Sequence, residues 1–362
     1  MINVSNIDEL YSAVNNPDNA DETIRLDPAG SPYKLKVVGS PSTAGRLELQ
    51  KNMSLIGKQG DNSKVVIDTS TLPGTSFLFP PFGRTGAIRM GLGSNSISWL
   101  TIEGHPNSAS GIDTDLPGKD PTTVKVAQVV SRGSSRGLDV RNVGAPNLGR
   151  RIDAEIVDND FSSGNDAQKP IEAIRFVNFV GATGGHIRAV MRRNRCHDSD
   201  IGLFAGNNRS NSGIVEVRLN GDIFDENAVG CVIVGASVLS GSGTTEKSST
   251  TFVADKSRFI NNTRPVAQVG ADSGGIVAVG ADLGATSHAN LNSVRVNLSD
   301  CVLSGNQNKD FEAFGARSTG GVATKNRARI QLKGVNILTD LVVAHDSQPP
   351  EPAGTNKVTV IS

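Results

Sequence analysis

The chain has 362 residues, and its 36 lysines and arginines balance 36 aspartates and glutamates, so the formal net charge is zero. This balance argues against a protein that coats nucleic acid, because such proteins carry a basic excess. The sequence has no run of 18 apolar residues, so it predicts no membrane span. The opening "MINVSNIDEL" lacks the pattern of a secretory leader.

The first 20 residues are predicted to form a capping helix. In "VSNIDELYSAVNN", Ser5 is the expected N-cap and Asp8 the acidic partner of a capping box. An apolar face follows at helical spacing, made of Ile7, Leu10, Tyr11 and Val14. The runs "ETIRL", "YKLKVV", "LELQKNMSLIG" and "KVVIDTS" then predict the strands of a first coil or two.

A repeating unit becomes clear after residue 150. Apolar anchors precede a corner at intervals of 35, 28, 35 and 44 residues: Phe161, Cys196, Phe224, Phe259 and Leu303. The positions five and seven before each anchor are apolar and their neighbours are mostly polar, which is typical of a strand with one buried face. Polar residues stand two before the anchors, at Asn159, Asn194, Asp222 and Ser257. Stacked copies therefore predict parallel strands about 4.8 Å apart and an inward polar ladder.

After each corner a second strand closes on an apolar residue and Gly, as in "VGA" and "FGA". Two long insertions follow that Gly, "GASVLSGSGTTEKSST" and "GADSGGIVAVGADLGATSHANLN", on the edge where solenoids carry functional loops. "RIQLKGVNILTDLVVA" is predicted as the last coil, and "KVTVIS" is a candidate returning strand. The predicted organisation is one domain over 1–362, with a cap at 1–20, coils at 21–344 and a tail at 345–362.

The capping helix, the "IRLDPAG" segment and the repeated "V-x-V-x-x-x-x-F-x-x-N" pattern resemble the right-handed parallel β-helix superfamily, the pectate-lyase-like fold. The resemblance covers nearly the whole chain. It implies an all-β, single-stranded right-handed parallel β-helix with long loops on one edge. This fold hosts polysaccharide lyases, glycoside hydrolases, epimerases, tailspikes and adhesins, so it does not fix the function. Its enzymes typically use acidic residues with Ca²⁺ and an Arg or Lys base, or pairs of Asp, but strings such as "NTD" and "GHG" are absent.

Because equivalent positions stack, the repeat also predicts which charged side chains are neighbours. His197 is expected above Asp225, and Asp198 above Glu226, one coil apart, with Arg195 just upstream. These five residues are the candidate catalytic group. Paired carboxylates repel unless a cation or a shared proton relieves them, so Asp198 and Glu226 are also candidate ligands of Ca²⁺. The alternative is a solvated corner with alternating charges.

Candidate substrate-binding residues lie beside this group and on the edge with the insertions: Arg192, Arg218, Asp272, Asp282 and Arg317. The resemblance favours a carbohydrate-active protein, a polysaccharide lyase or glycoside hydrolase that acts on a polysaccharide or glycan in an extended surface groove. The alternative is a non-catalytic glycan-binding, adhesin or tailspike-like β-helix, which the missing catalytic strings favour. The resemblance also favours an extracellular or cell-surface location. Nucleic acid is not an expected partner, and no membrane span is expected.

Overall fold

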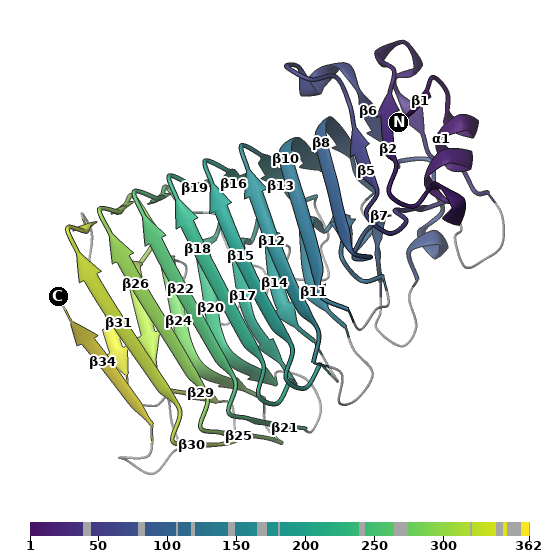
Figure 1. Cartoon of the computed structure of the whole chain (residues 1–362). Helices are drawn as coiled ribbons and strands as arrows, with labels where there is room; N and C mark the ends of the chain where they lie inside the picture. The colour runs from purple at the N-terminus through teal and green to yellow at the C-terminus, as the bar shows by residue number, and fades with distance from the viewer. Residues whose placement is uncertain are drawn as a thin grey trace.

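The computed structural model describes residues 1–38, 45–78, 84–105, 108–116, 120–143, 149–164, 172–179, 182–238, 243–263, 274–284, 286–318, 321–337, 343–345 and 356–361. Over these ranges the chain winds into a stack of parallel coils, a β-helix, with helix α1 at its N-terminal end (Figure 1). This confirms the predicted fold class. Within the same ranges, no helix combines the length and apolar character needed to cross a membrane.

Each complete coil contributes a long strand and a short strand to one parallel sheet, sheet A, and a third strand to a second parallel sheet, sheet B. The long strands of sheet A are β8 (Ser94–Glu103), β10 (Thr122–Arg132), β12 (Arg151–Val157), β15 (His186–Arg192), β18 (Ile214–Asn220), β22 (Ser249–Asp255), β26 (Ser293–Ser299), β31 (Arg327–Lys333) and β34 (Lys357–Ile361). The short strands are β13 (Asp160–Ser162), β16 (Arg195–His197), β19 (Ile223–Asp225), β23 (Arg258–Ile260), β27 (Val302–Ser304) and β32 (Asn336–Ile337).

Sheet B stacks the third strand of each coil. It contains β4 (Leu47–Glu48), β7 (Gly86–Arg89), β9 (Ser110–Asp113), β11 (Arg136–Asn142), β14 (Glu172–Asn178), β17 (Ile201–Asn208), β20 (Val229–Val238), β24 (Gly274–Leu283), β28 (Lys309–Phe314), β29 (Arg317–Ser318) and β33 (Val343–His345). The first coils are completed by β1 (Ile2–Val4), β2 (Thr23–Leu26), β3 (Tyr33–Lys34), β5 (Ser54–Ile56) and β6 (Val66–Asp68), with 3₁₀ turns at Pro17–Asn19, Pro28–Gly30, Asn62–Lys64 and Gly74–Phe77.

Strand register confirms that equivalent positions of the repeat stack directly. Val217 pairs with Phe252, which pairs with Val296 one coil later. The five predicted anchors also lie in register and are fully buried: Phe161, Cys196, Phe224, Phe259 and Leu303. A coil buries its inward residues only against its neighbours, so stability is distributed along the stack.

Polar ladders run through the interior beside the anchors. Asn159 Nδ2 donates to Asn194 Oδ1 at 2.8 Å, and Asn194 Nδ2 donates to Asp222 Oδ1 at 2.7 Å. This is the ladder that the sequence predicts. A second ladder starts at the next corner, where Asn227 Nδ2 donates to Asn262 Oδ1 at 3.1 Å. Both ladders satisfy buried amide groups that would otherwise destabilise the fold.

Helix α1 (Ile7–Val14) buries the predicted apolar face against the first coils. The predicted N-cap is wrong by one residue, because the helix starts later than expected. Asn6, not Ser5, is the N-cap, and its Oδ1 accepts from the Glu9 N–H at 3.0 Å. The Glu9 carboxylate, not that of Asp8, reaches back to the start of the helix, where it accepts from the Ser5 N–H at 2.7 Å.

Parts of the two insertions and a segment of the following coil form a small third parallel sheet along one edge of the stack, made of β21 (Gly243–Glu246), β25 (Ser287–Asn290) and β30 (Val322–Thr324) (Figure 1). The second predicted insertion is wrong in part, because its centre is β24, a full strand of sheet B. The described part of the "KVTVIS" segment, Lys357–Ile361, is a strand as predicted. It forms β34, which pairs in parallel with β31 and extends sheet A at the end opposite α1.

Candidate functional site

The predicted charged group lies at the corner where the short strands β16 and β19 end. Register places His197 beside Asp225 of the next coil. Asp198 and Glu226 follow these residues, and both adopt the left-handed backbone conformation, with φ of 51° and 57°. The predicted stacking of the charged residues is therefore present. Their catalytic role stays a prediction.

The His197 ring lies between two carboxylates. Its Nε2 is 2.6 Å from Asp160 Oδ1 in the preceding coil, and its Nδ1 is 2.7 Å from Asp198 Oδ2. The hydrogen bond with Asp160 raises the pKa of His197 above its ordinary value; burial opposes this, and the bond with Asp198 supports it. In its protonated form the ring donates one hydrogen bond to each carboxylate, and an imidazolium placed in this way can pass a proton to a bound molecule.

Sequence reasoning missed Asp160 as a partner of His197. Its signal was available, since Asp160 stands one residue before an anchor and is in register with Arg195. The Asp160 side chain therefore lies on the same outward row as that of Arg195, one coil nearer the N-terminus.

Arg195 is held by the carboxylate of Asp225. Its Nε donates to Asp225 Oδ1 at 3.0 Å and its Nη2 to Oδ2 at 2.8 Å, and Nη2 lies 3.7 Å from Glu226 Oε2. The hydrogen bond that Arg195 donates to Asp225 raises the pKa of Arg195 above its ordinary value. The guanidinium therefore does not suit the role of base that the superfamily resemblance implies, and it contributes positive charge instead.

The outer side chains of the charged group are exposed to solvent, and its central side chains are mostly buried. The side chains of Asp198 and Glu226 are 57% and 59% exposed, and that of Arg195 is 43% exposed. Those of His197 and Asp225 are only 16% and 15% exposed. A ligand can therefore reach the outer side chains without any rearrangement of the coils.

Among the described residues, one set of acidic and imidazole groups has metal-ligand spacing. The ligand atoms of His197, Asp198 and Glu226 all lie within 4.8 Å of one another. Ca²⁺ takes about six to eight oxygen ligands, whereas this set offers two carboxylates and an imidazole nitrogen. Imidazole combined with carboxylate suits Mn²⁺ or Zn²⁺ better. The donor set thus fits the Ca²⁺ suggested by the resemblance poorly.

The outer face of sheet A adjoins this corner and carries Arg192 and Arg218, two of the predicted substrate-binding residues. A shallow groove of about 400 Å³ crosses β10, β12 and β15 and is lined by Thr123, Arg151, Asp153, Glu155, Arg188 and Arg192. Arg192 Nη1 lies 3.4 Å from Glu155 Oε1 in this groove. Arg218 is one coil beyond it, in register with Val190.

The remaining predicted binding residues lie away from the corner. Arg317 Nε donates to Asp282 Oδ1 at 3.0 Å in sheet B, and the two side chains are only 14% and 8% exposed. Such a covered pair joins β29 to β24 and presents neither charge to a polymer. Asp272 lies outside the described residues.

Sequence reasoning also missed an ionic network of sheet B. Its side chains project from the outer face of the sheet and are nevertheless buried. Asp113, Asp139 and Arg175 stack in register across β9, β11 and β14. Arg141 joins two coils, because its Nε donates to Asp113 Oδ1 at 3.0 Å and its Nη2 to Asp115 Oδ2 at 2.8 Å. The strings "GIDTD", "GLDVRN" and "AIRFVN" were the signal, since each sets a charge among apolar residues of a second strand. With an arginine on every aspartate, the network is structural.

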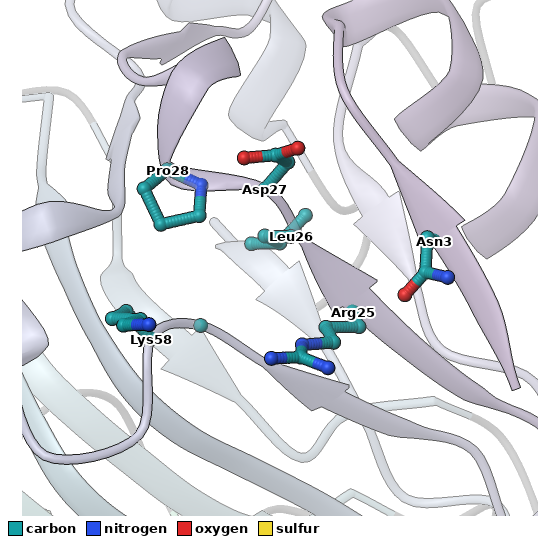
Figure 2. Close-up of a pocket in the computed structure, with 7 residues that line it drawn as sticks. Asn3, Arg25, Leu26, Asp27, Pro28 and Lys58 are labelled. Atoms are coloured by element: carbon teal, nitrogen blue, oxygen red, sulfur yellow. The ribbon is translucent and has the colours of Figure 1, made fainter.

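A recess of about 330 Å³ lies on the outer face of the first coils, at the edge of β1, β2 and the turn after β5. Figure 2 shows the Arg25 guanidinium extending toward the side of the recess on which Lys58 lies. Asp27 lies above both residues in this view. Asp27 Oδ1 accepts from the Ala29 N–H at 2.9 Å, so this carboxylate is occupied in capping a turn. The recess lacks a second acid or a histidine, and the candidate reactive site is therefore the corner.

No protein-family model matches the chain, and no curated protein sequence matches it. Among solved structures, the chain is similar to the A-module of mannuronan C-5 epimerase AlgE6 of Azotobacter vinelandii, with 15% identity, a TM-score of 0.43, and coverage of 97% of this chain and 100% of the module. The AlgE4 A-module of the same organism gives 15% identity, a TM-score of 0.44 and 100% coverage of both chains. Pectate lyase Pel9A gives 10% identity, a TM-score of 0.32, and coverage of 92% of this chain and 82% of the lyase. These TM-scores are low, and the architecture rests on the strand register.

Proposed function

We propose that the protein is carbohydrate-active and cleaves a polysaccharide at the corner formed by β16 and β19. The observation that carries this proposal is the position of the His197 ring between Asp160 and Asp198, at 2.6 and 2.7 Å, beside the exposed carboxylate of Glu226. A proton donor next to a carboxylate is what general acid–base cleavage of a glycosidic bond requires. The substrate class follows from the superfamily that the sequence repeat resembles.

In this proposal His197 is the general acid. It gives its proton to the leaving glycosidic oxygen, while the Glu226 or Asp198 carboxylate accepts a proton from the sugar or from an attacking water. Arg195, fixed by Asp225, supplies positive charge near an acidic sugar. An unsaturated product end would identify a lyase, and a new reducing end without unsaturation would identify a hydrolase.

Asp198 and Glu226 also stay our candidate cation ligands, with His197 as the third ligand. A cation held there would supply the positive charge that the protonated imidazole supplies in its absence. Metal ligation requires a neutral imidazole, so the cation and the proton compete for His197.

A second candidate function is glycan binding without catalysis. At the corner, the side chains of Arg195 and His197 are both paired with carboxylates. Ion pairs of the same form occur elsewhere on the stack without a reactive role, and this favours binding without catalysis. One example is Arg193, whose Nε donates to Asp158 Oδ1 at 2.7 Å at the preceding corner of the coil.

An assay on a panel of polyuronates and neutral glycans tests the proposal through new unsaturated and reducing ends. We expect turnover of one polymer, and a loss of about 100-fold or more in rate for His197→Asn and for Glu226→Gln with binding retained. The matched control is Arg193→Gln, which removes an exposed ion pair of the same coil and should leave the rate unchanged. Absence of turnover with glycan binding intact would favour the second candidate.

A further inference from the structure

The outer face of sheet A changes its charge pattern along the solenoid. In β12 and β15 cations alternate with acids and pair with them, as Arg151 does with Asp153 and Arg192 with Glu155. In the last three long strands, β26, β31 and β34, the outward positions carry no Asp or Glu. Five of these positions are cations, which we call the C-terminal basic patch: Arg295, Arg327, Arg329, Lys333 and Lys357.

The cations of this patch are stacked on one another. Arg295 is the register partner of Arg329, and Arg327 is the register partner of Lys357. Neighbouring strands lie about 4.8 Å apart, and like charges directly opposite each other destabilise a sheet. All the patch residues are exposed, and within the described part of the chain none of them makes an ion pair. No ion pair within the described residues therefore offsets these like charges.

We propose that the C-terminal basic patch binds an anionic polysaccharide, and that this surface is separate from the corner site. Cations spaced about 4.8 Å across strands and about 7 Å along them offer a grid to which carboxylate or sulfate groups can bind. The arginine forks match such anions with paired hydrogen bonds. Asn297, Gln331 and Thr359 lie between the cations and offer hydrogen bonds to sugar hydroxyls. The polymer class rests on the proposed function, but the surface does not.

The composition of the patch favours a sugar polymer over nucleic acid or lipid. Single-stranded nucleic acids bind to aromatic side chains that stack with the bases, and the outward positions of β26, β31 and β34 include no aromatic residue. Membrane surfaces take up large apolar side chains beside the cations, and Ile361 is the single large apolar residue at these positions.

Calorimetric titration with polygalacturonate, dextran sulfate, neutral dextran and a single-stranded oligonucleotide tests the inference. We expect both anionic polysaccharides to bind and dextran not to bind, with affinity falling at least tenfold between about 50 and 200 mM salt because counterions are released. The double variant Arg327→Gln, Arg329→Gln should bind the anionic polysaccharides about tenfold more weakly or worse. The matched control, Arg132→Gln with Arg193→Gln, removes two exposed cations that are paired with Glu103 and Asp158, and its binding should stay within about twofold.

Equal weakening in the patch and control variants would overturn the inference, as would dextran binding of similar strength or tighter binding of the oligonucleotide than of either polysaccharide. The salt dependence is measured on the unchanged protein, so the test does not depend on how a variant folds. Failure of the proposed function is a separate result. His197→Asn removes turnover at the corner and should leave binding at the patch intact.

Discussion

The rings of Phe224 and Phe259 stack face to face across two consecutive coils, with their centroids 5.1 Å apart and their planes 4° apart. The two residues are 35 positions apart in the sequence and are direct register partners of β19 and β23. Both rings are fully buried. This contact packs two neighbouring coils together at the level of the corner site. The packing of the core therefore also holds a strand that carries the site.

Replacing Phe259 tests how much this stack stabilises the solenoid. We expect Phe259→Ala to lower the free energy of unfolding by about 3–5 kcal/mol, because it removes a buried ring and leaves a cavity between coils. Denaturant unfolding followed by circular dichroism measures the change. The control is Ile214→Ala at a position that is 39% exposed, where the loss should stay below about 1 kcal/mol. Similar losses at the two positions would contradict the role of the stack.

The sequence was sufficient for the coil register because every coil must place apolar residues inward at the same positions. A slip of one residue would turn a whole strand inside out, so the pattern around Phe224 and Phe259 fixes the stacking. The same register predicted that His197 lies beside Asp225. The strand β24 was mistaken for an insertion, because it is buried along its whole length and therefore shows no alternation of polar and apolar residues.

Other features depended on contacts that sequence periodicity does not encode. The sequence sets Asp113 and Asp139 among apolar residues of their strands, but only the packed structure shows that both side chains are fully buried. The hydrogen bond between His197 and Asp160 depends on side-chain rotamers across two coils. The backbone repeat fixes which residues are neighbours, but it does not fix which of several nearby carboxylates an imidazole contacts.

Asp222 gives the stability of the protein a distinctive pH dependence. Burial raises the pKa of Asp222 from 3.8 to about 6, although hydrogen bonds from Asn194 and Asn220 lower it. In the unfolded chain the carboxyl ionises near pH 4, while in the folded chain it keeps its proton until about pH 6. The free energy of unfolding should therefore fall as the pH rises from 4 to 6, by on the order of 2–3 kcal/mol.

Unfolding of the Asp222→Asn variant across this pH range isolates the effect. The variant should lack this fall in stability, because an amide does not titrate. Asp300→Asn, which removes an exposed aspartate, serves as the control and should keep the fall. A variant of Asp222 that loses as much stability between pH 4 and 6 as the unchanged protein would refute the assignment.

The buried network of sheet B should be sensitive to the loss of a single arginine. Arg141→Ala leaves Asp113 buried without its guanidinium and Asp115 with only that of Arg89, so we expect a loss of about 3–5 kcal/mol in the free energy of unfolding. The comparison is Arg151→Ala, whose ion pair with Asp153 is exposed to solvent and should contribute little to stability. Thermal unfolding of both variants measures the difference, and a loss at Arg141 no larger than that at Arg151 would show that the network does not stabilise the fold.

Asp139 should make the stability of the same network fall at acid pH. Burial alone would raise the pKa of Asp139, but Arg175 and Arg141 lower it to about 2. This carboxylate therefore stabilises the fold above about pH 4, and its contribution should be lost as the pH falls from 4 to 2. Asp139→Asn should unfold with a shallower pH dependence below pH 4 than the unchanged protein, whereas an unchanged dependence would assign the acid sensitivity to other groups.

Cation binding at the corner should depend on pH through His197. Binding displaces the proton that the ring shares with Asp160 and Asp198, so Mn²⁺ affinity should fall as the pH drops below the raised pKa of His197. Calorimetry in two buffers of different ionisation enthalpy should detect the released proton. Because the donor set includes a nitrogen, we expect Ca²⁺ to bind at least about tenfold more weakly than Mn²⁺. Glu226→Gln should weaken Mn²⁺ binding, whereas Arg193→Gln should not; tighter binding of Ca²⁺, or an affinity for Mn²⁺ that ignores pH, would show that His197 is not a ligand.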